Sequence, residues 1–379
     1  MTSEDFKDHI YACILAGGGG TRLWPKSTNK TPKQFLKLFE GKTLTQITAK
    51  RLRSFLTWDK IYVVTVSNEY KQEILEEVPR LHPENIIVEP ARRNTAPAHA
   101  IGAVYIYKKD PDAVIINAAA DHLISPDRGY KKTMEVAAKV VYGGDHLIAV
   151  GIEPTYPGTG YGHLKRGKKF AVVNGKTVYK SDKFVEKPDY LTAERFNKTG
   201  KYFWNANHYV WRADSLIKAI NKFEPKVGRA MEKINNAIGT SNEKSIVLKE
   251  YKGLPKKTTD GKPMSIDYAI SEKAKNFLLV VANYNWTDIG DWSEVWTNLK
   301  HDNLGNVIID GGEEGGEIIK IDTSNALIHT DGRLIAAIDV DDIVIVDTKK
   351  VLLVCRKDQA QNVKKIVNQL KEEGRKELL

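Results

Sequence analysis

The 379-residue sequence contains little sulfur, with only two cysteines and four methionines. Two cysteines cannot build a disulfide framework, and Cys13 and Cys355 match no metal-binding spacing. Each lies in an apolar run, so we expect both to be thiols buried on strands. A disulfide-stabilised scaffold and a cysteine-ligated metal protein are therefore excluded.

Long apolar runs are also missing. No run approaches the roughly 20 residues that a membrane-spanning helix needs. The first ten residues, MTSEDFKDHI, are polar and lack the apolar core of a signal peptide. We therefore expect a cytoplasmic protein with no membrane partner.

Charge of one sign is not concentrated in any segment. The net charge of +10 raises the question of a nucleic-acid partner, because clustered Lys and Arg neutralise phosphates. However, no block of five consecutive basic residues occurs, and the seven tryptophans show no periodicity with basic residues. A solvated surface of mixed charge, with small anionic substrates, explains the surplus better. We expect no nucleic-acid partner.

What the sequence does contain, as far as about residue 302, is an alternation of short apolar runs and longer amphipathic stretches. The apolar runs indicate buried strands at 11–16, 60–66, 113–120 and 146–152. Stretches between them, such as LTQITAKRLRSF and APAHAIGAVYIYKK, have helical apolar spacing. This alternation predicts an α/β domain over 1–302, with a mainly parallel sheet between helices. Such sheets bind ligands beyond the carboxyl ends of their strands.

A different texture begins after residue 302. Short β-branched runs, from VIIDGG to KVLLVCR, are broken every six to nine residues by Asp, Gly or Asn. This cadence fits either a small antiparallel sheet or stacked solenoid rungs. The closing stretch QNVKKIVNQLKEEGRK has apolar residues at 363, 366, 367 and 370, which predicts an amphipathic helix. We therefore predict a second domain over 303–379.

A glycine-rich loop directly follows the first predicted strand. Its residues are Ala16, Gly17, Gly18, Gly19, Gly20, Thr21 and Arg22. Consecutive glycines permit positive φ, and their amides can surround an anion. The loop is neither a dinucleotide fingerprint nor a Walker loop, because Arg22 stands where each requires a glycine. Together with Lys33 in the segment PKQFL, it predicts a triphosphate site in which Arg22 and Lys33 supply positive charge.

The stretch ILAGGGGTRLWPKSTNKTPKQFLKL resembles the signature of the mannose-1-phosphate guanylyltransferases, also called GDP-mannose pyrophosphorylases. Further matches to this family follow in order along the chain: EPARRNTAPA, ADH, GTGYGHLKRG, FVEKPD, WNANHYVW, SIDYAISEK and NWTDIGDW. The resemblance implies a Rossmann-like nucleotide-diphospho-sugar transferase domain with a mixed, mainly parallel sheet. A small left-handed β-helix with a terminal helix would follow it. Bifunctional relatives carry a phosphomannose isomerase domain for which this chain is too short, so the resemblance is to the monofunctional form.

The resemblance also implies a reaction, in which GTP and mannose 1-phosphate give GDP-mannose and pyrophosphate. A sugar-phosphate oxygen attacks the α-phosphorus in line, and it is already ionised near neutral pH, so no general base is required. Such a site needs fixed cations and a divalent metal. Two alternatives remain open. One is the same chemistry with another hexose 1-phosphate or nucleoside triphosphate, and the other is a catalytically silent regulatory homologue.

Two aspartates are the candidate metal ligands. Asp121 follows the predicted strand 113–120, and Asp288 lies just before Asp291 and Glu294, a plausible capping pair for a helix. Carboxylates far apart in sequence can converge on one Mg²⁺, which favours carboxylate oxygens together with substrate phosphates. The resemblance makes Asp121 and Asp288 the ligands of Mg²⁺ or another divalent cation, and it places Asp121 in the nucleotide site as well.

The resemblance assigns the sugar-phosphate site to four residues. Lys187, in FVEKPD, would bind the sugar phosphate, and the sugar would be contacted by Gly160, Glu186 and Asn205. Arg22, Lys33 and Lys187 would be the catalytic cations.

For guanine, the resemblance implies contacts from Glu89, Asn94 and Thr95. From the residues alone, Thr95 is a reasonable helix cap, with Pro97 tolerated in the first turn.

The sequence departs from the family pattern beside the proposed sugar contact. Ala206 and Asn207 replace a serine and a glycine that are usual there, which leaves sugar specificity open. The resemblance and the solenoid-like C-terminal region favour a homodimer.

Overall fold

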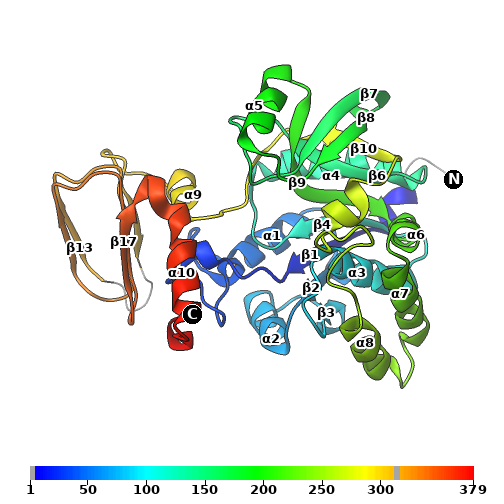
Figure 1. Cartoon of the computed structure of the whole chain (residues 1–379), viewed down its shortest axis with the longest axis horizontal. Coiled ribbons are helices and arrows are strands. Elements are labelled where there is room, and N and C mark those ends of the chain that lie inside the picture. Colours follow the sequence, from blue (N-terminus) through cyan, green and yellow to red (C-terminus); the bar gives the residue numbers. More distant parts are fainter. Residues whose placement is uncertain (1–4, 311–315) are drawn as a thin grey trace. The chain divides into compact units, whose positions relative to one another are not determined.

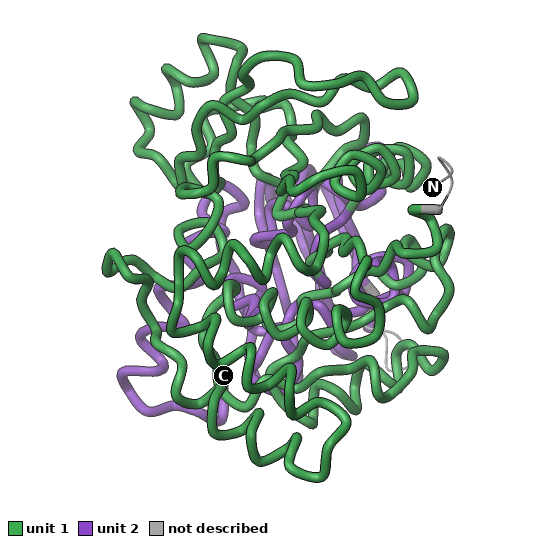
Figure 2. Tube along the Cα trace, turned by 90° about the vertical axis from the view of Figure 1, so that its right-hand side faces the viewer, with its two compact units in different colours: residues 1–17, 49–119, 124–286 green, residues 18–48, 120–123, 287–379 purple. Residues whose placement is uncertain are grey.

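The structure, a computed structural model, describes residues 5–310 and 316–379 (Figure 1). Gly311 and Gly312 of the predicted VIIDGG strand lie outside the described residues. By internal contacts the chain divides into two compact units that alternate along the sequence (Figure 2). Unit 1 comprises residues 1–17, 49–119 and 124–286, and unit 2 comprises residues 18–48, 120–123 and 287–379. Unit 2 thus combines the glycine-loop segment with the C-terminal region, whereas the predicted boundary near residue 302 stays a prediction.

Unit 1 is built on a mixed sheet, in which the described residues form nine strands in the order β3-β2-β1-β4-β9-β6-β10-β8-β7. Their bounds are β1 (Ile10–Ala16), β2 (Ile61–Thr65), β3 (Ile86–Val88), β4 (Val114–Ala119), β6 (Leu147–Ile152), β7 (His163–Val173), β8 (Lys176–Val185), β9 (Tyr202–Arg212) and β10 (Phe277–Val281). The four strands predicted from apolar runs are β1, β2, β4 and β6. Strands β3, β2, β1 and β4 are parallel, and β9 runs antiparallel to β4 and β6.

Helices follow the strands of unit 1, as the alternation predicted. Their bounds are α2 (Asn68–Glu77), α3 (Thr95–Lys109), α4 (Asp127–Tyr142), α5 (Tyr190–Thr199), α6 (Ala213–Phe223), α7 (Pro225–Ala237) and α8 (Glu243–Lys252), with the end of α1 (Leu44–Arg53). Helices α3, α6 and α7 pack against one another beside the sheet (Figure 1). Within the described residues, no helix is long and apolar enough to cross a membrane.

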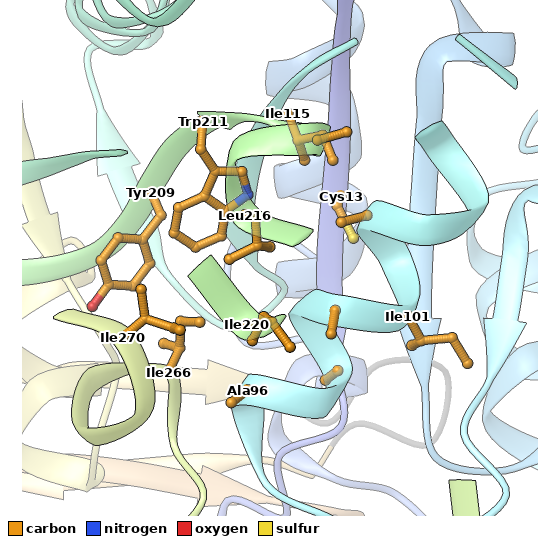
Figure 3. Packing of buried hydrophobic residues seen from close by; sticks show 14 of the residues in the cluster. Cys13, Ala96, Ile101, Ile115, Tyr209, Trp211, Leu216, Ile220, Ile266 and Ile270 are labelled. Carbon is orange, nitrogen blue, oxygen red and sulfur yellow. The ribbon is translucent and has the colours of Figure 1, made fainter. Parts of the chain in front are cut away.

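The core of unit 1 lies where α3 meets β1. Cys13 is fully buried there and Ile101 packs nearby (Figure 3). A Cβ on Gly102 would lie 2.6 Å from the Cys13 sulfur, so only glycine lets the helix approach the strand this closely. Both cysteines are free, and Cys355 is only half-buried, so the prediction of a buried thiol is confirmed for Cys13 alone.

The C-terminal part of unit 2 is a β-helix. Its strands are β12 (Val307–Asp310), β13 (Ile318–Ile321), β14 (Leu327–Thr330), β15 (Ile335–Ile338), β16 (Ile343–Asp347) and β17 (Leu352–Arg356). Strands β12, β14 and β16 pair in parallel, as do β13 and β15, so stacked rungs rather than an antiparallel sheet explain the sequence cadence. The polar breaks are corners with positive φ, namely Asp322, Asn325, Asp339 and Asp342.

One hydrophobic cluster joins the glycine-loop segment to the β-helix within unit 2. Leu23, Trp24 and Leu44 contribute to it, together with Leu327 of β14 and Val363 of α10 (Val363–Glu372). The Trp24 indole NH donates to the carbonyl of Leu378 at 2.7 Å. The predicted closing helix is confirmed as α10. Its buried apolar side chains pack in the same cluster as the apolar residues that follow the glycine loop.

We predict that Leu327→Ala destabilises unit 2 by about 2–5 kcal/mol, because this fully buried side chain leaves a cavity in the shared cluster. Denaturant unfolding followed by intrinsic fluorescence measures the loss. Leu334→Ala is the matched control, since Leu334 is 58% exposed in the same unit and its truncation should change stability by no more than about 0.5 kcal/mol. Equal effects of the two substitutions would contradict the assignment of the core.

Candidate functional site

Lys33 is the centre of the polar cluster in unit 2. It begins a short 3₁₀ helix (Lys33–Phe35) after Pro32 and is only 8% exposed. Its Nζ lies 2.9 Å from Asp121 Oδ2 and donates to the backbone carbonyl of Asp288 at 2.6 Å. Three predicted site residues from distant parts of the sequence are therefore brought together by one ammonium group.

The charge state of Asp121 follows from this pairing. Burial favours its neutral form, but the Lys33 ammonium more than offsets burial and holds the pKa of Asp121 below its ordinary value. The Asp121 side chain keeps about a quarter of its surface exposed. It is an ionised carboxylate that solvent can still reach.

Asp288 contributes to the cluster in an unexpected way, since its backbone carbonyl rather than its carboxylate contacts Lys33. The adjacent Asp291 caps α9 (Trp292–Asn298) by accepting from the amides of Ser293 and Glu294, as predicted. Glu294, the other member of the predicted capping pair, instead accepts from the Thr287 hydroxyl at 3.0 Å. Among residues 5–310 and 316–379, no group of three His, Cys, Asp or Glu side chains could hold a metal ion.

The glycines of the loop have different surroundings. Gly20 has φ +61°, and a Cβ there would lie 2.4 Å from the Lys33 Cβ, so only glycine lets the loop pass over Lys33. A Cβ on Gly18 would lie 3.6 Å from Asp121 Oδ2, whereas one on Gly19 would meet open space. The loop backbone is thus exposed beside the Lys33–Asp121 ion pair, and the Ser27 hydroxyl fixes it by donating to the Gly19 carbonyl at 2.9 Å.

Arg22 does not join the Lys33 cluster. It lies in a 3₁₀ turn (Thr21–Leu23) and its side chain is exposed. The positive charge of Arg22 favours the ionised form of Asp291. Burial of the Asp291 carboxyl group has the larger effect, so the pKa of Asp291 is raised overall. An exposed guanidinium at the end of a glycine loop is available to a bound anion.

A second cluster, in unit 1, contains the residues assigned to the sugar phosphate. Lys187 follows β8 with φ +44°, and its Nζ lies 2.5 Å from Glu186 Oε1. Asn205, on β9, donates its backbone NH to the Gly162 carbonyl at 2.7 Å, and a Cβ on Gly162 would lie 2.7 Å from Glu186 Oε2. Gly160 faces open space in the same loop. The structure therefore brings Glu186, Lys187, Asn205 and this loop together.

Sequence reasoning missed a buried carboxyl group in this cluster. Asp267 is 7% exposed and begins a π-helical turn (Asp267–Ser271). Its Oδ1 accepts from Asn205 Nδ2 at 3.1 Å and from the Tyr209 hydroxyl at 2.6 Å. Burial raises the pKa of Asp267, and burial together with the nearby Asp267 carboxyl group raises the pKa of Glu186. The motif SIDYAISEK contained this residue, but only the fold shows what it contacts.

A third group, also in unit 1, contains the residues assigned to guanine. Glu89 is buried, and burial raises its pKa to about 7 although Tyr251 donates a hydrogen bond to its Oε2. Its Oε1 lies 4.0 Å from where a Cβ on Gly17 would be. Glu89 therefore faces the start of the glycine loop with one carboxylate oxygen.

The predicted helix cap at Thr95 is wrong by one residue. Asn94, with φ +70°, is the N-cap of α3, and its side chain accepts from the Thr95 amide at 2.8 Å. With ψ −176°, this backbone is extended on the positive-φ side, a conformation that few residues other than glycine adopt. The Thr95 hydroxyl instead accepts from the Ile266 amide at 2.9 Å, next to Asp267.

Comparison with known families agrees with the motif pattern. Residues 11–303 match the model of the nucleotidyl transferase family, and residues 316–370 match a mannose-phosphate isomerase/GMP-like β-helix domain. A mannose-1-phosphate guanylyltransferase of Escherichia coli is 36% identical over 96% of this chain and 76% of its own length. The chain belongs to the mannose-1-phosphate guanylyltransferase family.

Other relatives agree with this assignment. The mannose-1-phosphate guanylyltransferase RfbM of Salmonella typhimurium strain LT2 is 36% identical over 96% of this chain and 73% of its own length. A crystal structure of a Thermus thermophilus protein named mannose-1-phosphate geranyltransferase superposes with a TM-score of 0.82. That protein is 28% identical, and the match covers 96% of this chain and 99% of the other.

One departure from the guanylyltransferase pattern has a structural explanation. Asn207, which stands where the resemblance implies a glycine, adopts φ +54°. Asparagine is among the few residues other than glycine that accept this conformation readily. Its backbone NH donates to Asn205 Oδ1 at 3.2 Å, so the substitution preserves the local backbone beside Asn205.

We predict that Gly20→Ala lowers nucleotidyl transfer at least about tenfold, because the new Cβ displaces Lys33 from Asp121 and Asp288. Steady-state kinetics measures the loss. The matched control is Gly41→Ala, since Gly41 also has positive φ (+69°) in unit 2 but open space around it. That variant should lose about 1 kcal/mol of stability and keep its turnover. A similar loss of turnover in both variants would attribute the effect to backbone strain rather than to Lys33.

Proposed function

We propose that the protein transfers GMP from GTP to mannose 1-phosphate, giving GDP-mannose and pyrophosphate. The observation that carries the proposal is the Lys33–Asp121 ion pair beside an exposed glycine-loop backbone. Backbone amides, a fixed ammonium and an ionised carboxylate suit the binding of a triphosphate. The identity of about 36% to curated guanylyltransferases supports GTP and mannose 1-phosphate as the substrates.

The reaction needs positioning and charge stabilisation rather than a protein nucleophile. An oxygen of mannose 1-phosphate forms a bond to the α-phosphorus of GTP, and the bond from that phosphorus to the bridging α–β oxygen breaks. Pyrophosphate leaves with the electron pair, so the step balances without an added base. In our proposal Arg22 and Lys33 neutralise the triphosphate, while Lys187 neutralises the sugar phosphate.

Substrate recognition is assigned to the remaining residues. An ionised Glu89 can accept hydrogen bonds from the N1–H and amino group of guanine, and Asn94 and Thr95 add polar groups at the start of α3. Glu186, Asn205 and Gly160 are assigned to the sugar. The ionised form of Glu89 favours guanine over adenine, because adenine lacks the N1–H donor.

A divalent cation fits the donor chemistry of the Lys33 cluster. Asp121 offers an ionised carboxylate that is about a quarter exposed, and the backbone carbonyl of Asp288 lies at the same ammonium group. Mg²⁺ is commonly held by one or two carboxylates, with phosphates and waters completing its coordination. We propose Asp121 and Asp288 as its ligands, and the cation would neutralise charge on the phosphates when bound.

The location and assembly of the protein remain proposals. We propose a cytoplasmic homodimer with no nucleic-acid partner, in which residues 1–302 carry the catalytic domain and residues 303–379 the β-helix domain.

We predict that, in a matrix of nucleoside triphosphates and hexose 1-phosphates assayed with Mg²⁺, GTP with mannose 1-phosphate gives the highest kcat/KM for pyrophosphate release. The same matrix with a chelator in place of Mg²⁺ should show little activity. A higher kcat/KM for another pair would overturn the assigned substrates. Nucleotide binding without turnover in any pair would instead indicate a regulatory homologue.

We further predict that Asp121→Asn lowers turnover about 100-fold or more, because it removes the carboxylate that pairs with Lys33 and is proposed to bind the cation. Circular dichroism and thermal melting should show a folded protein. Asp322→Asn is the control, since Asp322 is an exposed β-helix corner where asparagine accepts the positive φ. Turnover of Asp121→Asn within twofold of the unsubstituted enzyme would refute the role of Asp121.

A further inference from the structure

The side chain of Asn205 is held in one orientation by its neighbours. Its Nδ2 donates to the Tyr209 hydroxyl at 2.7 Å and to Asp267 Oδ1 at 3.1 Å. The same nitrogen also lies 3.5 Å from Asn207 Oδ1, and a carboxamide nitrogen has only two hydrogens for these three acceptors. Asn205 Oδ1 accepts one hydrogen bond, from the Asn207 amide at 3.2 Å, and an oxygen of this type can accept a second.

Asp267 determines which end of the carboxamide faces inward. An ionised carboxylate only accepts hydrogen bonds, so it selects the NH₂ group of Asn205 and turns the carbonyl oxygen away from itself. Tyr209 alone would not select, because a hydroxyl group both donates and accepts. In this structure the Tyr209 proton is already committed to Asp267 Oδ1 at 2.6 Å.

The network is rigid and buried. Asn205, Tyr209 and Asp267 are each less than a tenth exposed, and the Ser271 hydroxyl donates to the Tyr209 oxygen at 3.2 Å. Figure 3 shows the Tyr209 ring beside Ile266 and Ile270. Ile266 directly precedes Asp267, and Ile270 lies in the π-helical turn that Asp267 begins. Reorienting the carboxamide would leave a buried polar group unpaired, at a cost of about 1–3 kcal/mol.

We infer that Asp267 is a positioning residue for the sugar-phosphate site, because its carboxylate fixes the Asn205 carboxamide with the carbonyl oxygen available to a sugar hydroxyl. This inference rests on the proposed function, in which Asn205 contacts the sugar. It adds a residue that itself need not touch the substrate. Asp267 is not one of the proposed metal ligands, and it has no proposed contact with a substrate phosphate.

The test compares two substitutions of Asp267 that differ only in the acceptor they retain. Asp267→Ala removes the acceptor, so the KM for the sugar phosphate should rise about 10- to 100-fold while the KM for GTP changes less than twofold. Asp267→Asn retains an oxygen that can accept from Asn205, so it should recover most of the sugar-phosphate affinity. An unchanged sugar-phosphate KM in Asp267→Ala, or an equal rise of both KM values, would overturn the inference.

A double-mutant cycle tests whether Asp267 acts through Asn205. If it does, Asp267→Ala should add less than about twofold to the sugar-phosphate KM of Asn205→Ala. A full additional effect in the double variant would show that Asp267 acts by another route and would contradict the inference.

Should Asp267→Ala fail to fold, Asn205→Asp decides the question. It keeps the outward oxygen but places a carboxylate against Asp267, so the sugar-phosphate KM should rise at least as much as in Asn205→Ala. A KM within twofold of the unsubstituted enzyme would overturn the inference. All assays use the hexose 1-phosphate that the unsubstituted enzyme turns over best. Failure with mannose 1-phosphate in the unsubstituted enzyme would therefore count against the proposed substrate and not against Asp267.

Discussion

The burial of the Lys33 ammonium is the constraint on which unit 2 depends. An ammonium that is almost excluded from water requires oxygen partners, and here they are the Asp121 carboxylate and the Asp288 carbonyl. These partners come from the segment after β4 and from the segment before α9, far apart in sequence. Satisfying one charge therefore fixes the relative positions of three segments. Gly20 is part of the same constraint, because any side chain there would occupy the space of Lys33.

The β-helix belongs to this arrangement rather than being an appendage. The hydrophobic residues next to the glycine loop pack into the cluster that includes Leu327 of β14 and Val363 of α10. The Trp292 indole donates to the Trp24 carbonyl at 3.0 Å, and Lys26 forms an ion pair with Asp331 at 2.9 Å. These contacts fix the segment that contains Lys33. Packing in the C-terminal rungs therefore limits the mobility of the glycine-loop backbone.

Local patterns could be predicted from the sequence, and long-range contacts could not. The strands, the glycine loop, the Asp291 cap and helix α10 depend on neighbouring residues, so apolar spacing and cap chemistry identified them. The cap at α3 was predicted one residue late because Asn94 takes a positive-φ, extended backbone that no propensity indicates. Asp267 was missed because its importance lies in contacts with residues about sixty positions away. The carbonyl contact of Asp288 could not be predicted either, since side-chain identity says nothing about backbone acceptors.

The two units solve a similar electrostatic problem in similar ways. Lys33 is paired with Asp121, and Lys187 is paired with Glu186, which has Asp267 as a further negative neighbour. Burial alone would lower the pKa of Lys187, but its pairing with Glu186 raises it, so the ammonium stays charged. A phosphate that binds either lysine must therefore compete with a carboxylate already in place. Each lysine therefore contributes less to the binding free energy of a phosphate than its full Coulomb attraction, because one ion pair is exchanged for another. In the proposed function, selectivity for a substrate would then depend on the neighbouring hydrogen-bonding groups, such as the loop amides and Asn205, which a simple anion does not use fully.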